Sequence, residues 1–121
     1  MKKISIFGAG LVGSLLSIYL AKRGYKVDIY ERRADMRKES RLGGTAGRSI
    51  NLALSERGWR GLEGVRLADE IRKIAIPMKG RMIHPQAKNP QIVFQPYGKE
   101  GQAIYSVSRG GLNIKMMDLA E

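Results

Sequence analysis

The hydrophobic and polar positions of the first 31 residues predict a strand, a helix and a second strand. Residues 3–7 predict a short buried strand, with Ile4 and Ile6 on one face. Apolar residues then fall at i, i+3, i+4, i+7 and i+8, which predicts a helix with one apolar face: Val12, Leu15, Leu16, Tyr19 and Leu20. Gly24 is placed to cap this helix. Apolar and polar residues alternate again up to Glu31, so the sequence predicts a βαβ unit.

The next part of the chain has weaker periodicity. Residues 32–47 are charged and rich in glycine, which predicts a loop with a short helical piece. Alternation over Ser49–Leu54 predicts a half-buried strand, and Ser55 is a suitable N-cap for a helix that carries Trp59 and Leu62. We expect a further helical turn or two before Pro77.

The last forty or so residues change in character. Three β-type runs, at residues 81–83, 92–95 and 103–107, are separated by prolines and glycines and predict a small antiparallel sheet. Ser108 is placed to cap a final helix, on which Leu112, Met116 and Leu119 share one face. This helix meets no stop signal before residue 121, so we expect the chain to be a piece of a longer protein.

Three glycines between the first strand and the first helix carry the strongest chemical signal. Gly8, Gly10 and Gly13 follow the G-x-G-x-x-G spacing of a dinucleotide-binding turn. Glu31 lies 18 residues past Gly13, at the end of the second strand, where a carboxylate accepts hydrogen bonds from a ribose 2′-hydroxyl. The alternative is an ordinary turn with a solvated strand-end charge. Because Glu31 would repel a 2′-phosphate, the pattern favours FAD or NAD over NADP.

Composition narrows the classes of function. The chain contains no cysteine, which excludes disulfides, thiolate metal sites and a cysteine nucleophile. It has no apolar run of spanning length and no clear export signal, so a soluble cytoplasmic protein is expected. The net charge of +11 raises the question of a nucleic-acid partner. The basic residues are scattered and aromatic residues are few, so we expect no such partner; a phosphate-bearing cofactor and an anionic substrate account better for the charge.

Five segments in fixed order carry a resemblance to a known family. They read GAGLVGSLLSIYLAKRGYKVDIYERR, GRSINLALSERG, IPMKGRMIH, PYG and SVSRGGLN. Together they resemble the N-terminal part of the kynurenine 3-monooxygenase family of FAD-dependent aromatic hydroxylases, over nearly the whole chain. The resemblance implies a bound FAD, with NADPH as reductant, O₂ as oxidant and L-kynurenine converted to 3-hydroxykynurenine. It implies no metal, and it assigns no catalytic side chain in this stretch.

The resemblance also implies roles for individual residues. Ten match cofactor-binding positions of the family: Gly8, Gly10, Val12, Gly13, Tyr30, Glu31, Arg32, Arg33, Ala53 and Arg109. Arg81 and Tyr97 match residues that hold the substrate's amino-acid carboxylate, to which a guanidinium can bind bidentately. Read without the resemblance, they are a solvated strand arginine and a tyrosine packed beside Pro96. We interpret Trp59 as a packing residue rather than a flavin stacker.

The expected organisation is an α/β, Rossmann-like FAD-binding part at residues 1–79, the start of a substrate-binding sheet at 80–107, and a helix returning to the FAD-binding part at 108–121. The family's later Gly-Asp segment, which completes its FAD site, is absent, so we expect the isolated chain to be inactive. Two alternatives stay open: an FAD hydroxylase of another aromatic acid, and a non-enzymatic basic module that binds a nucleotide. Unpaired sheet edges also make a homodimer an expectation. Arg66 stands where the family usually has glycine.

Overall fold

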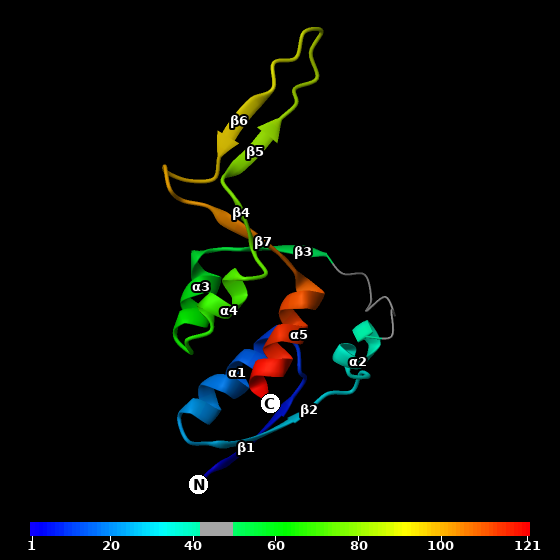
Figure 1. Ribbon diagram of the computed structural model, residues 1–121, viewed down its shortest axis with the longest axis vertical. Helices are drawn as coiled ribbons and strands as arrows, with labels where there is room; N and C mark the ends of the chain where they lie inside the picture. The colour runs from blue at the N-terminus through cyan, green and yellow to red at the C-terminus, as the bar shows by residue number, and fades with distance from the viewer. Residues whose placement is uncertain (42–49) are drawn as a thin grey trace.

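The predicted βαβ unit is present in the computed structural model, which describes residues 1–41 and 50–121 (Figure 1). Strand β1 (Lys3–Phe7) leads through a glycine turn into helix α1 (Leu11–Lys22), and strand β2 (Lys26–Tyr30) returns beside β1. The two strands are parallel, and their register runs from Lys3 opposite Lys26 to Phe7 opposite Tyr30. The carboxyl ends of both strands therefore meet at one edge, beside the glycine turn.

A second sheet has the strand order β3–β7–β4. It consists of β3 (Asn51–Leu54), β7 (Ile104–Ser108) and β4 (Ile76–Met78), and both pairings are antiparallel. The sequence missed β4, because Pro77 was read as the end of a helical stretch. Proline is tolerated there because β4 is an edge strand of this sheet.

The remaining two strands form a separate hairpin. Strands β5 (Gly80–Ile83) and β6 (Val93–Pro96) pair antiparallel. Figure 1 shows this hairpin projecting from the body of the molecule, away from the β1–α1–β2 unit. The expectation that the third β-type run would join this small sheet was wrong, since β7 pairs with β3 and β4 instead.

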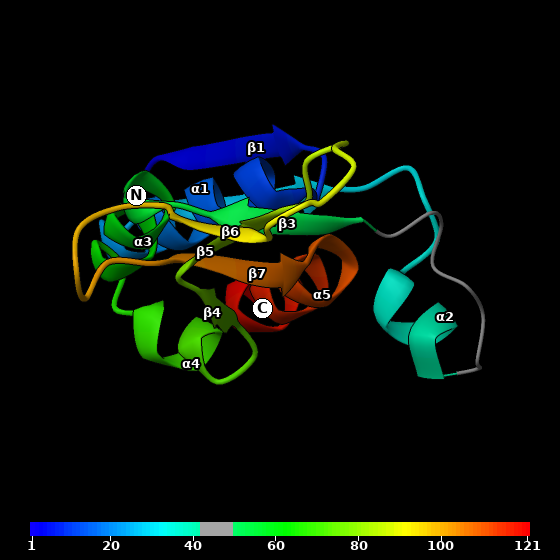
Figure 2. The same ribbon diagram turned by 90° about the horizontal axis from the view of Figure 1, so that it is seen from above.

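Four further helices complete the described chain: α2 (Met36–Arg41), α3 (Glu56–Glu63), α4 (Ala68–Arg72) and α5 (Arg109–Ala120). Helix α2 is the short helical piece expected after β2; residues 42–47 of the expected loop, and Ser49 of the expected strand, lie outside the described residues. Figures 1 and 2 show α2 at one side of the molecule. None of the helices in residues 1–41 and 50–121 is long and apolar enough to cross a membrane.

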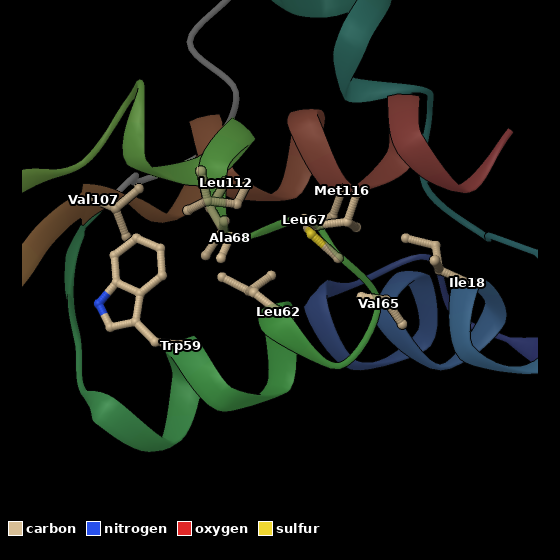
Figure 3. Packing of buried hydrophobic residues seen from close by; sticks show 10 residues of the cluster. Ile18, Trp59, Leu62, Val65, Leu67, Ala68, Val107, Leu112 and Met116 are labelled. Carbon is tan, nitrogen blue, oxygen red and sulfur yellow. The ribbon is translucent and has the colours of Figure 1, made fainter. Parts of the chain in front are cut away.

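The hydrophobic core lies where α1, α3, α4 and α5 meet β7 (Figure 3). Its buried members come from all five elements and the short α3–α4 connection: Ile18, Trp59, Leu62, Val65, Leu67, Ala68, Ile71, Val107, Leu112 and Met116. The Trp59 ring packs edge-on against the Tyr105 ring, with centroids 5.0 Å apart. The interpretation of Trp59 as a packing residue is confirmed, as is the shared apolar face of the last helix.

Helix α1 buries only part of the predicted apolar face: Leu15 and Tyr19 pack against the core, but the fully buried residues lie beside them. Ser14, Ser17 and Ile18 are its buried residues, whereas Val12 is 81% exposed and Leu16 46% exposed. The two serine hydroxyls bond to carbonyls within the turn and helix, to Ala9 O at 3.3 Å and Ser14 O at 2.7 Å. Because these hydroxyls are satisfied locally and are small, α1 can pack directly against α5. The prediction is therefore confirmed for Leu15 and Tyr19 and wrong for Val12 and Leu16.

The cap of α5 supplies a stability prediction. The Ser108 side chain accepts a hydrogen bond from the Gly111 N–H at 3.2 Å, whereas Ser55 occupies the N-cap of α3 without a side-chain cap bond. Ser108→Ala should therefore lower the free energy of unfolding by about 1 kcal/mol. Ser55→Ala is the matched control and should change it much less, as measured by urea unfolding; equal losses at the two sites would contradict the assignment.

Candidate functional site

The glycine turn between β1 and α1 has a backbone that side chains would not permit. Gly8 has a φ of +113°, in the region that favours glycine, and its N–H donates to Tyr30 O at 2.7 Å. A Cβ added at Gly13 would lie 1.9 Å from the Gly8 carbonyl oxygen, so α1 could not approach the turn so closely. A Cβ at Gly10 would meet nothing within 4 Å, which leaves open space above the turn.

The first turn of α1 presents unpaired N–H groups to that space. Gly10 is the N-cap, and the Ser14 N–H makes a 2.9 Å bond to its carbonyl. The N–H groups of Leu11, Val12 and Gly13 come before any intrahelical acceptor. Together with the positive end of the helix dipole, they favour an anionic ligand at this position.

A hollow of about 690 Å³ gathers most of the predicted turn residues and two arginines. Gly8, Gly10, Val12 and Gly13 line it, and so do Arg33 and Arg109 from distant parts of the chain. Arg109 is the first residue of α5, so the N-terminal ends of two helices border the same hollow. Two guanidinium groups and a helix N-terminus form a suitable environment for a pyrophosphate.

Asn113 is a residue of this hollow that the sequence did not single out. It is 6% exposed and lies one helical turn after Arg109 on α5. Its Nδ2 contacts the Met36 sulfur at 2.9 Å, which links α5 to α2. The signal that could have found it is the i, i+4 spacing from Arg109, which places both side chains on one face.

A second, smaller hollow lies beside the first at the ends of β1 and β2. Phe7, Gly8, Tyr30, Glu31 and Arg32 line it. The Phe7 and Tyr30 rings stack with centroids 5.3 Å apart, and both remain exposed, at 84% and 52%. Phe7 was not predicted as a site residue, and its pairing with Tyr30 follows from the parallel register. The structure thus places all four predicted residues of the 30–33 segment beside the glycine turn.

Glu31 is held by three hydrogen bonds. Its Oε2 accepts the Ala9 N–H at 2.8 Å, and its Oε1 accepts the Arg33 N–H at 2.9 Å and the Arg33 Nε–H at 3.0 Å. These bonds stabilise the ionised carboxylate and lower the pKa of Glu31 to about 2, and the hydrogen bond from the Arg33 side chain makes the largest contribution. The side chain is 19% exposed, so the carboxylate can still be reached by a ligand.

The lowered pKa of Glu31 predicts a pH-dependent contribution to stability. The folded-state pKa of about 2 lies below the ordinary value of 4.5, so the carboxylate stabilises the fold above pH 4.5. That contribution is lost progressively as the pH falls through 4.5 toward 2. Glu31→Gln should therefore lower the free energy of unfolding at pH 7, and the difference from the wild type should vanish near pH 2. Urea unfolding across this range measures it; a difference that does not change with pH would contradict the prediction.

Arg81 and Tyr97 both belong to the segment of the β5–β6 hairpin, away from the glycine turn. Arg81 is opposite Gln95 in the β5–β6 register, and its Nε donates to Gln95 Oε1 at 2.7 Å. Tyr97 follows the last residue of β6, and its N–H donates to Lys79 O at 3.0 Å, next to the start of β5. Tyr97 is 45% exposed, and Arg81 is also exposed. The described chain does not bring this pair to the hollow at the turn (Figure 1).

Ala53 also lies apart from the turn. It is an exposed residue of β3, opposite Ser106 of β7, and is not among the residues that line the hollow with Arg109. The four glycine-turn residues, the 30–33 segment and Arg109 are therefore the predicted cofactor residues that the fold assembles. The open space above Gly10, the free N–H groups of α1 and the two arginines fit an adenine dinucleotide.

Comparison with known proteins agrees with this geometry. Residues 6–50 match the family described as "NAD(P)-binding Rossmann-like domain". The kynurenine 3-monooxygenases of Flavobacterium johnsoniae and Myxococcus xanthus are each 56% identical to the chain over 119 residues. Both alignments cover 98% of this chain and 25% of the relative. The chain therefore spans about a quarter of the length of the curated relatives it matches.

Solved structures support the fold. The tetrameric form of 2-methyl-3-hydroxypyridine-5-carboxylic acid oxygenase superposes with a TM-score of 0.68 at 19% identity. The superposition covers 99% of this chain and 29% of the oxygenase chain. The predicted α/β fold, with its Rossmann-like βαβ core, is confirmed.

Proposed function

We propose, from its similarity to kynurenine 3-monooxygenases, that this chain forms the adenosine side of the FAD site and part of the substrate site of an L-kynurenine hydroxylase. The observation that carries the proposal is the hollow at the glycine turn. It combines the N-terminus of α1 with Arg33 and Arg109, at the carboxyl ends of two parallel strands. That is where Rossmann-like folds bind dinucleotides.

The residues around the turn have separate roles in this proposal. The N–H groups of Leu11, Val12 and Gly13, with Arg109, bind the pyrophosphate. Glu31 accepts a hydrogen bond from the adenosine ribose, and Tyr30 and Arg32 border it. Ala53 faces the cofactor from β3. Bound FAD supplies the oxygen-transfer chemistry, for which NADPH is the reductant and O₂ the oxidant.

Arg81 and Tyr97 are proposed to bind the amino-acid carboxylate of L-kynurenine. The Arg81 Nε is bonded to Gln95, which fixes the guanidinium plane and leaves its two terminal nitrogens for a carboxylate. The Tyr97 hydroxyl adds a further donor from the end of the same hairpin. The pair would fix the substrate by its charged end and leave the aromatic ring free to approach the flavin.

The domain ranges belong to the same proposal. Residues 1–79 and 108–121 form the FAD-binding part, and residues 80–107 begin the substrate-binding sheet. We place the enzyme in the cytoplasm. Pairing between chains at the open edges of the β5–β6 hairpin remains a prediction, tested by the mass of the protein in solution.

A chimaera tests the hydroxylase directly. The matching quarter of the Flavobacterium johnsoniae enzyme is replaced by this chain, and the product is assayed with L-kynurenine, NADPH and O₂. We expect 3-hydroxykynurenine and an equivalent consumption of NADPH. A chimaera that retains FAD but hydroxylates only a different aromatic acid would favour the alternative substrate. A chimaera that folds without binding FAD would contradict the cofactor assignment.

The net charge of +11 is the one observation that favours a basic nucleotide- or nucleic-acid-binding module instead. Titration of the chain with ADP and with a DNA duplex, at several salt concentrations, separates the two. Duplex binding that exceeds ADP binding and collapses with salt would support the module. We expect ADP to bind more tightly than the duplex at 0.15 M salt, where the screening length is about 8 Å.

A further inference from the structure

The two oxygens of the Glu31 carboxylate have different partners. Among the described residues, Oε2 accepts a hydrogen bond only from the Ala9 N–H of the turn, at 2.8 Å. Oε1 bonds only to Arg33, through its backbone N–H at 2.9 Å and its Nε–H at 3.0 Å. One carboxylate thus connects the middle of the glycine turn to the segment after β2.

The bond to Ala9 cannot easily be given up. Ala9 is 7% exposed, and a buried backbone N–H without a partner is costly. The neighbouring Gly8 N–H is already bonded to Tyr30 O at 2.7 Å. The turn is therefore tied to the end of β2 at two successive residues, and one of these two ties is the Glu31 side chain.

The bond to Arg33 is easier to exchange. The Arg33 side chain is 62% exposed, in contrast to 19% for Glu31. Arg33 lines the hollow at the N-terminus of α1, and with Ala9 and Glu31 it also lines a third hollow of about 480 Å³. A rotation of its long side chain can therefore move the guanidinium from the carboxylate to a phosphate without a change in the backbone.

We propose that Glu31 is a positioning residue for the glycine turn, fixing it through Oε2 and Ala9, and that Oε1 is the oxygen Arg33 releases to an adenosine ribose. The release of Oε1 rests on the proposed function, whereas the positioning of the turn does not. On binding, a ribose hydroxyl replaces the Arg33 Nε–H at Oε1, the Arg33 backbone N–H keeps its bond to the same oxygen, and the Arg33 guanidinium moves to the pyrophosphate. Ala9 keeps its bond throughout.

Amide hydrogen exchange in the ligand-free chain tests the positioning role. Glu31→Ala should speed exchange at the Ala9 N–H by roughly 10- to 100-fold, the effect of losing one hydrogen bond to a charged acceptor. Arg33→Ala is the matched control, because it leaves Oε2 and Ala9 in place, and it should keep the Ala9 protection. Glu31→Gln retains an oxygen acceptor and should give an intermediate rate. The positioning role of Glu31 would be overturned if the Ala9 N–H exchanged at the same rate in the wild type, in Glu31→Gln and in Glu31→Ala.

Exchange at core amides, such as those of α5, provides the folding control for these variants. If Glu31→Ala unfolds the chain, the Glu31→Gln variant decides. Faster exchange at Ala9 with unchanged core amides then supports the positioning role, and unchanged Ala9 exchange overturns it.

Binding of adenosine and ADP tests the release of Oε1. Arg33→Ala should raise the affinity for adenosine, because it removes the side-chain competitor for Oε1 and leaves only the backbone N–H there, and lower the affinity for ADP, because it removes a phosphate ligand. The ratio of ADP to adenosine affinity should fall roughly tenfold, equivalent to about 1.4 kcal/mol. An unchanged ratio would overturn the exchange of Arg33. If the wild-type chain binds neither ligand, the proposed function and the release of Oε1 both fail, and the Ala9 exchange rates still decide the positioning role.

Discussion

Replacing Gly13 with alanine is expected to reduce ADP binding on the order of 100-fold, because the new Cβ would lie 1.9 Å from the Gly8 carbonyl oxygen. That contact is with backbone, so either the turn or the start of α1 must move. Movement of α1 displaces the N–H groups of Leu11 and Val12 from the phosphate position. Isothermal titration with ADP measures the loss.

Two other glycines supply the controls. A Cβ at Gly61 would meet only Leu15 Cδ2 at 3.7 Å, so Gly61→Ala should leave ADP binding unchanged. A Cβ at Gly10 would meet nothing within 4 Å, so Gly10→Ala should fold normally yet weaken ADP binding by filling the ligand's space. If Gly13→Ala bound ADP as tightly as Gly61→Ala, the close approach of α1 would have no role in the site.

The second large effect is expected at the hairpin. Arg81→Ala in the chimaera should raise the KM for L-kynurenine on the order of 100-fold, because it removes the charge-assisted hydrogen bonds to the substrate carboxylate. We expect a smaller change in kcat, since the carboxylate is bound equally in the substrate and the transition state. Steady-state kinetics with 3-hydroxykynurenine detection separates the two parameters.

Arg60→Ala is the matched control for this prediction. Arg60 forms an exposed ion pair with Glu56 on α3, and both side chains are more than 70% exposed, so its loss should not alter the KM. Arg81→Lys should give an intermediate KM, because an ammonium keeps the charge and loses the fork geometry. An unchanged KM in the Arg81→Ala variant would show that Arg81 is a solvated surface residue with no role in substrate binding.

The local elements of the fold could be predicted from the sequence because their signals lie close together in the chain. The β1–α1–β2 unit spans 28 residues, from Lys3 to Tyr30, and includes the glycine turn and the Gly24 cap, which has a φ of +82°. Strand pairing is not a local property, so no local pattern predicts β7 beside β3 and β4. The buried face of α1 was predicted only in part for a similar reason: the burial of Ser14 and Ser17 depends on contact with α5, which is distant in the chain.

Arg66 shows how backbone conformation explains a departure from the family pattern. It has a φ of 61°, the left-handed region that non-glycine residues adopt at a cost. The connection between α3 and α4 therefore has a residue position that suits glycine, in agreement with the glycine that the resemblance leads one to expect there. Nothing in the sequence around Arg66 indicated this turn.

The candidate site likewise has features that could be predicted from the sequence and features that could not. The glycine turn and Glu31 were predictable because each is tied to a fixed place in a βαβ unit. The Glu31–Ala9 bond, the buried Asn113 and the stacked Phe7 ring depend on contacts between elements far apart in the chain. Arg81 and Tyr97 were found only through the resemblance, since residues of their type are common on exposed strands.

The most direct test of the account is an ADP titration of the ¹⁵N-labelled chain, followed by amide chemical shifts. We predict saturable shifts concentrated at residues 8–14 and 30–33 and at the start of α5, with weaker binding of 2′,5′-ADP because its 2′-phosphate meets Glu31. Saturable shifts confined to other surfaces, or equal binding of the two nucleotides, would contradict the assignment of the glycine turn and Glu31 as the adenosine site.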